Sequence, residues 1–165
     1  MNTTTYQHEA SQPEAQSFSY TPAEKVILQQ AAFIIEERFQ RQDSYTSPES
    51  VMSYLQCQLA HEEREVFALM LLDNQHRLIR YLPMFYGTID SASVYPREVV
   101  KAALQANAAA VILAHNHPSG VSEPSTSDQT ITDKLVKALN LIDVRVLDHI
   151  VVGSTCCSFA QRGLL

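Results

Sequence analysis

The segment Ala109-Ala-Val-Ile-Leu-Ala114, followed directly by His115-Asn-His-Pro-Ser-Gly120, is the part of the sequence that decides the fold. Its first six residues are all apolar, and a run of that length predicts a buried β-strand. Pro, Gly, Ser and Asn are dense from His115 to Pro124, which predicts a loop, and Ser125 begins an expected helix. A buried strand that leads through a loop into an amphipathic helix is typical of α/β proteins.

Further strands are expected on both sides of this segment. Glu65–Asp73 and Arg77–Tyr86 are separated by a turn and predict a hairpin, and two more strands are expected at about Val144–Val152 and Thr155–Phe159. A helix begins at Pro96, between the hairpin and the buried strand. The sequence therefore predicts an α/β domain in which a mixed β-sheet is flanked by helices.

The chain before the hairpin divides into two parts. Residues 1–20 contain no Val, Ile or Leu, and we predict a disordered tail because such a segment cannot bury enough apolar surface to fold. Two helices are expected within residues 21–61: one begins at Thr21-Pro22, where Glu24 completes a capping box, and the other at Ser47-Pro48. Residues 62–165 then form the main predicted domain.

Composition narrows the class of protein. At 165 residues, with 45% hydrophobic and 18% charged residues, the chain is expected to be a soluble globular protein with one main core. A net charge of -6 opposes broad binding to nucleic acid, which needs a basic surface. A local basic patch is still compatible with this charge. Because neither a membrane-spanning run nor a secretory signal is recognisable, we expect a cytoplasmic location and no membrane partner. The oligomeric state is not predicted.

The side chains that indicate chemistry follow the buried strand. Residues two apart near the end of a strand point to the same side, so His115 and His117 can present two imidazoles to one point. Asp128 lies in the first turn of the next helix, and the Pro- and Gly-containing loop folds it back toward them. Two imidazoles and one carboxylate match the ligand preferences of zinc and leave the fourth position open, which is typical of a catalytic site.

Two further residues are candidates for catalysis. Ser125 lies three residues before Asp128 on the same helical face, where its hydroxyl can contact a reacting oxygen, cap the helix, or do both. A general base is expected among the glutamates at the start of the first strand. We assign this role to Glu65, and Glu63 remains the alternative.

These motifs resemble those of a known family. His115-x-His117-Pro118, followed by Ser125 and Asp128, resembles the JAMM motif of the JAB/MPN metalloproteases. More narrowly, residues 62–165 resemble the RadC-like branch of that family through the following segments: Glu65-x-Phe67, Gly87-Thr88, Pro96-Arg97-Glu98, His115–Gly120 and Asp148-His149-Ile150.

The resemblance implies a cytidine-deaminase-like architecture and a zinc ion on His115, His117 and Asp128. It also implies that Glu65 acts through a zinc-activated water and that Ser125 stabilises the oxyanion. The RadC-like branch includes full-length proteins with an N-terminal helix-hairpin-helix region of the kind that contacts DNA. The N-terminal helices expected here contain no Gly-x-Gly hairpin, which weakens the carry-over of a DNA-repair role.

The main hypothesis is therefore a zinc-dependent metallopeptidase or isopeptidase that acts on a peptide or protein substrate. The alternatives are a DNA-repair-associated or nucleic-acid-processing protein and a binding module without activity. His61-Glu62 begins like a His-Glu-x-x-His zinc helix, but Glu65 occupies the position of the second histidine. A zinc deaminase is not favoured, because the spacing of Cys156-Cys157 does not provide Pro-Cys-x-x-Cys. We interpret His149 as a buried core residue, with the orientation of a metal ligand as the alternative.

Overall fold

The computed structural model of the chain describes residues 21–23, 26–27, 30, 48–87 and 93–165. The chain divides into two compact units, Met1–Arg41 and Gln42–Leu165. In the first unit, Pro22 and Ala23 are helical, which agrees with the predicted helix start. The predicted tail at 1–20, Glu24 of the capping box and most of that helix lie outside the described residues.

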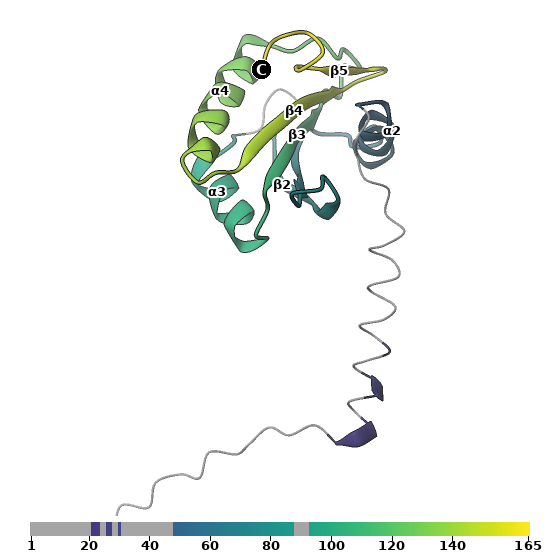
Figure 1. Cartoon of the computed structure of the whole chain (residues 1–165). Coiled ribbons are helices and arrows are strands. Elements are labelled where there is room, and N and C mark those ends of the chain that lie inside the picture. Colours follow the sequence, from purple (N-terminus) through teal and green to yellow (C-terminus); the bar gives the residue numbers. More distant parts are fainter. Residues whose placement is uncertain (1–20, 24–25, 28–29, 31–47, 88–92) are drawn as a thin grey trace, which may run out of the picture. The chain divides into compact units, whose positions relative to one another are not determined.

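The second unit is built on a mixed five-stranded sheet with the strand order β2-β1-β3-β4-β5 (Figure 1). The strands are β1 (Val66–Leu72), β2 (Leu78–Tyr86), β3 (Ala110–Asn116), β4 (Arg145–Val152) and β5 (Cys156–Ser158). β3 and β4 pair in parallel, whereas the other neighbouring pairs are antiparallel. The predicted fold class, α/β with a mixed sheet, is confirmed.

Helices cover both faces of this sheet (Figure 1). α2 (Pro48–Leu59) packs on one face, and α3 (Pro96–Gln105) and α4 (Thr126–Asn140) pack on the other. All seven residues of β1 are buried, because alternate side chains point into the two apolar cores on either side of the sheet. Within the described ranges, no helix combines the length and the apolar character needed to cross a membrane.

α4 is the crossover between two parallel strands. Parallel neighbours cannot be joined by a tight turn, so the chain leaves the end of β3, passes through α4 and returns to the start of β4. The loop after β3 and the first turn of α4 consequently lie at the same end of the sheet. In open α/β sheets, this carboxyl end of the strands is where ligands bind.

β3 is longer than the apolar run suggested. The predicted loop begins at His115, but β3 continues to Asn116, and both residues are almost completely buried. His115 pairs with Phe67 of β1 and with Val151 of β4, so backbone pairing on both sides extends the strand past the point where polar residues begin. The first imidazole is therefore fixed by the sheet, and the loop begins at His117.

Candidate metal centre

The backbone directs three predicted ligands toward one point. His115 lies on the same face of β3 as Leu113, which packs in the core beneath α3 and α4. His117 follows two residues later, and its backbone N–H donates to the carbonyl of Val152 at 2.9 Å. Asp128 is the third residue of α4, so its carboxylate projects from the first turn of the helix that packs over this face.

The distances among these side chains match those of metal ligands. The two Nε2 atoms of His115 and His117 are 3.0 Å apart, and Asp128 lies 3.5 Å from the first (through Oδ1) and 3.6 Å from the second (through Oδ2). Neighbouring ligand atoms of a tetrahedral zinc ion with bonds of 2.0–2.1 Å are about 3.3–3.4 Å apart. The three groups therefore fit one tetrahedral cation without a change of backbone.

Burial is graded across the cluster. The side chain of His115 is 1% exposed, whereas those of His117 and Asp128 are 19% and 14% exposed. The centre is thus closed on the side of the sheet and reached by solvent from the side of the loop. A cation held there keeps an open face for water and substrate, as in catalytic rather than structural zinc sites.

The orientation of His117 is fixed by a backbone acceptor. Its Nδ1 lies 2.7 Å from the carbonyl oxygen of Val121. A carbonyl only accepts hydrogen bonds, so Nδ1 carries the proton, and Nε2 of the neutral ring presents its lone pair to the cluster. This is the tautomer in which Nε2 can bind a metal ion.

Asp128 is held by the cap of its own helix. Ser125 is the N-cap of α4: its Oγ accepts a hydrogen bond from the Asp128 N–H at 3.1 Å, and its N–H donates to Asp128 Oδ2 at 2.7 Å. Burial raises the pKa of Asp128, but the adjacent His115 ring and the hydrogen bonds with Ser125 lower it by more, so the pKa lies well below its ordinary value. The group is therefore a carboxylate near neutral pH, the form that binds cations.

The predicted capping role of Ser125 is thus confirmed. In this cap the hydroxyl oxygen is an acceptor, which leaves its proton available to an oxygen of a substrate. Its role in oxyanion stabilisation remains a prediction.

His149 is a buried residue that contacts the first predicted ligand. It lies in β4, is 0% exposed, and its Nε2 is 2.8 Å from Nδ1 of His115. Complete burial lowers the pKa of His149 well below its ordinary value, and the neighbouring His115 adds to this effect, so the ring is neutral. The interpretation of His149 as a buried core residue is confirmed, and its contact with His115 is also compatible with the alternative, a residue that orients a ligand.

Glu65 precedes the strand that pairs with the first predicted ligand. Phe67 pairs with His115, and Glu65 lies two residues before Phe67, so in an extended backbone the two side chains share a face. Glu65 is half-buried directly before β1, whereas Glu63 is exposed in a bend outside the strand. This arrangement favours Glu65 over Glu63 as the general base, and the role itself remains a prediction.

Sequence reasoning missed Asn116, which lies between the two histidines and points to the opposite face. Its Oδ1 accepts from the Val66 N–H at 2.8 Å, and its Nδ2 donates to the carbonyls of Glu62 and Arg64 at 3.2 and 3.0 Å. One amide therefore fixes the backbone on both sides of Glu65. The only sequence signal was an amide at the end of a buried strand, where a polar side chain needs partners.

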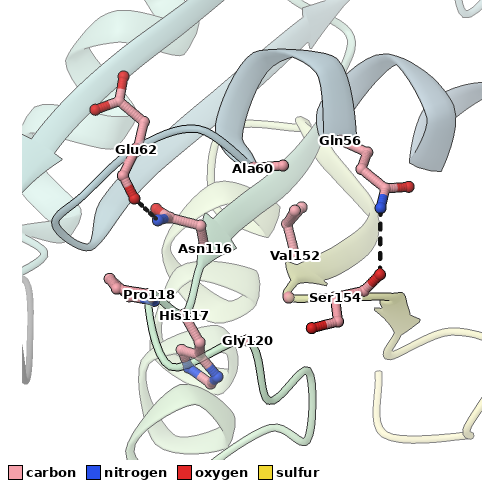
Figure 2. Close-up of a pocket in the computed structure, with 10 residues that line it drawn as sticks. Gln56, Ala60, Glu62, Asn116, His117, Pro118, Gly120, Val152 and Ser154 are labelled. Carbon is pink, nitrogen blue, oxygen red and sulfur yellow. Dashed lines mark hydrogen bonds between the residues drawn. The ribbon is translucent and has the colours of Figure 1, made fainter.

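A pocket lies on the α2 face of the sheet, the face opposite the one covered by α4, and His117 is the residue of the cluster that contributes to its lining (Figure 2). It has a volume of about 280 Å³ and lies between the end of α2, the end of β3 and the turn after β4. Small residues such as Ala60, Gly120 and Gly153 form part of its wall. Figure 2 shows the Glu62 side chain pointing away from His117, so that carboxylate is not directed at the cluster.

Comparisons with known proteins agree with this architecture. The sequence profile described as the RadC-like JAB domain matches residues 45–164. Two UPF0758 proteins of Vibrio cholerae are 60% identical over 142 residues and 56% identical over 139 residues, and the matches cover 86% and 84% of this chain and 90% and 88% of theirs. A longer UPF0758 protein of Aeromonas hydrophila is 58% identical over 142 residues, which are 86% of this chain and 63% of that protein.

Proposed function

This chain belongs to the RadC-like JAB domain family, and from that premise we propose that it is a zinc-dependent hydrolase that cleaves an amide bond as a metallopeptidase or isopeptidase. The observation that carries the proposal is the convergence of the His115, His117 and Asp128 ligand atoms, which all lie within 4.8 Å of one another. The donor set of two imidazoles and one carboxylate favours zinc over magnesium or calcium, which prefer oxygen ligands.

His115, His117 and Asp128 would hold the cation from three directions. Bound there, zinc supplies Lewis acidity, which polarises a scissile carbonyl and makes a water molecule more acidic. The remaining chemistry belongs to side chains of this chain. Glu65 takes the proton from the attacking water and passes it to the leaving amine, a role supported by its position two residues before Phe67, the β1 partner of His115.

Hydrolysis also needs a hydrogen-bond donor for the developing oxyanion and a surface that binds the substrate. The Ser125 hydroxyl donates to the oxygen on which negative charge develops, a contact that counts most in the transition state. The substrate would lie along the exposed side of the cluster, where the side chains of His117 and Asp128 reach solvent.

The proposed partner is a peptide or protein. The alternative, a nucleic-acid-processing protein, needs a basic surface, and the net charge of -6 opposes it. Titration of the full chain with single-stranded, duplex and branched DNA at low and at physiological salt separates the two. We expect no binding at physiological salt, and tight, salt-dependent binding would favour the alternative.

The metal is tested first. We expect the purified full chain to hold one zinc ion per molecule by elemental mass spectrometry, and we expect His117→Ala to lose it. His61→Ala is the matched control, because this exposed histidine lies outside the cluster and its loss leaves zinc unchanged. Equal zinc content in His117→Ala and the wild type would overturn the assignment.

Cleavage is tested without knowledge of the natural substrate. The zinc-loaded chain is incubated with a library of peptides and of isopeptide-linked peptides, and newly formed amines are identified by mass spectrometry. We expect products that disappear on treatment with a chelator and with Asp128→Asn. A chain that holds zinc yet yields no product from either library would count against amide hydrolysis.

A further inference from the structure

A buried line of hydrogen bonds connects the first predicted ligand to the third. Nδ1 of His115 is 2.8 Å from Nε2 of His149, and Nδ1 of His149 is 2.6 Å from Oγ1 of Thr132. The Thr132 hydroxyl in turn donates to the backbone carbonyl of Asp128 at 2.6 Å. The line therefore runs from β3 through β4 to α4 and ends on the residue whose carboxylate faces the cation.

The protons along this line can be assigned one by one. The carbonyl of Asp128 only accepts, so the single hydroxyl proton of Thr132 is directed at it. Thr132 Oγ1 must then accept from His149, which places the one proton of that neutral ring on Nδ1. Nε2 of His149 is left as an acceptor, and His115 donates to it from its own Nδ1. In the neutral form of the His115 ring, which is the form that binds a metal ion, Nε2 is then the nitrogen without a proton and faces the cluster with its lone pair.

The surroundings keep the two rings in this arrangement. His115 and His149 are 1% and 0% exposed, so no solvent replaces their partners. The His115 ring lies nearly parallel to that of Phe67, and the His149 ring stacks on Phe159 with centroids 4.6 Å apart. Neither ring can turn without breaking a close contact, and each nitrogen therefore keeps its partner.

We propose that Thr132 and His149 are positioning residues of the metal centre: together they hold His115 in the tautomer whose Nε2 binds a divalent cation. His117 obtains the same tautomer from the carbonyl of Val121, whereas His115, enclosed between β1 and β4, obtains it from side chains. Such outer partners commonly change metal affinity by about 10–100-fold. The inference rests on the proposed zinc site, but it concerns proton positions that exist before any metal binds.

The proton positions are tested in the metal-free full chain. Nitrogen-15 NMR of the histidine rings distinguishes a proton on Nδ1 from one on Nε2. We expect His115, His117 and His149 all to carry the proton on Nδ1. A His115 or His149 ring whose Nδ1 carries no proton would overturn the inference, even if the chain binds zinc. If the chain takes up no zinc at all, the proposed function fails while this spectrum still decides the tautomers.

The effect on metal binding is tested with three threonine variants. Thr132→Val removes the hydroxyl at nearly constant shape, and we expect zinc affinity, measured by competition with a chromophoric chelator, to fall about 10–100-fold. Thr132→Ser restores the hydroxyl and should restore the affinity. Thr130→Val is the matched control, because that exposed threonine donates to the Thr126 carbonyl at 2.9 Å without contacting a histidine.

Each outcome has a clear meaning. Wild-type zinc affinity in Thr132→Val would overturn the inference, as would a loss of similar size in Thr130→Val. A circular dichroism spectrum of each metal-free variant shows whether it is folded. Should Thr132→Val fail to fold, the ring spectrum of the wild type remains the deciding measurement.

Discussion

At the scale of single residues, the first turn of α4 combines stability and function in the same atoms. Asp128 closes the capping box with Ser125 and also turns its carboxylate toward two imidazoles. A capping box satisfies backbone groups that a helix otherwise leaves unpaired. The cap therefore supports the orientation of the predicted ligand. A substitution here changes both helix stability and activity, so the two must be measured separately.

Ser125→Gly makes that separation for the serine. Glycine is tolerated at the N-cap at a cost of a few tenths of a kcal/mol, so the helix should persist while the hydroxyl is lost. We expect zinc content to be unchanged and kcat to fall by about 10²–10³-fold, the usual effect of losing one oxyanion donor. Unchanged kcat with wild-type zinc content would restrict Ser125 to its role as a cap.

Glu65→Gln tests the proposed general base. The amide keeps the shape of the side chain but cannot take a proton, so we expect hydrolysis to fall by about 10²–10⁴-fold with zinc retained. Glu63→Gln is the natural control, because that glutamate is exposed and lies outside the strand. Should Glu63→Gln lose activity while Glu65→Gln keeps it, the base would be Glu63.

At the scale of elements, the loop that carries His117 is fastened to the turn after β4. The Ser154 N–H donates to the carbonyl of Gly120 at 2.8 Å, and Ser122 Oγ lies 3.1 Å from Thr155 Oγ1. Gly120 itself has φ of 81°, a conformation that glycine adopts without strain. The turn and the loop therefore behave as one structural piece next to the cluster.

Gly153→Ala should disturb that piece. A Cβ at this position would overlap the carbonyl oxygen of Gly120, a backbone atom that cannot move without moving the loop. We expect a loss of about 1–3 kcal/mol in the free energy of unfolding, measured with urea, together with weaker zinc binding. Gly163→Ala is the control: its φ of 68° also disfavours alanine, but a Cβ there meets nothing within 4 Å, so zinc affinity should not change. Equal zinc affinity in both variants would show that the loop adapts to the overlap.

Asn116 fastens the segment before β1 in a similar way. Asn116→Ala removes the partners of one N–H and two carbonyls, and we expect it to lower the free energy of unfolding by about 2–4 kcal/mol. Asn140→Ala, at the exposed end of α4, should have little effect. Similar urea midpoints for Asn116→Ala and the wild type would mean that water replaces the side chain at these groups.

The difference between what the sequence predicted and what it missed lies at this scale. Local signals placed the elements well: Pro96 is the first residue of α3, Ser125 is the N-cap of α4, and the apolar residues Ala110–Ala114 lie in β3. The spacing of two histidines and an aspartate also identified the residues that converge. These features depend on patterns within a few residues, which a single sequence displays directly.

Contacts between distant segments were not predictable in the same way. The hydrogen bonds of Asn116 join positions 50 to 54 residues apart, and the bond between His115 and His149 spans 34 residues. They depend on strand register, which no local pattern specifies. Only a weak pattern in the sequence pointed to a role for Thr132: it is a polar residue four positions after Asp128, on the buried side of α4. Its partner emerges only once β4 is placed beside β3.

At the scale of the whole molecule, zinc should stabilise the folded chain. Its proposed ligands come from β3, the following loop and α4, and unfolding separates them. At a free zinc concentration 100-fold above Kd, we expect the free energy of unfolding to rise by about 2.7 kcal/mol. The thermal midpoint should fall when a chelator is added, and His117→Ala should show no such dependence. A wild-type midpoint that is insensitive to both zinc and chelator would contradict the proposed site.

The three proposed ligands lie close together along the chain, whereas the proposed base lies far from them in the sequence. His115, His117 and Asp128 lie within one strand-to-helix connection, whereas Glu65 reaches them only through the pairing of β1 with β3. During folding, contacts between near neighbours in sequence generally form more readily than those that close long loops. The three ligands can therefore approach one another at a small cost in loop-closure entropy, whereas the proposed base joins them only when β1 pairs with β3.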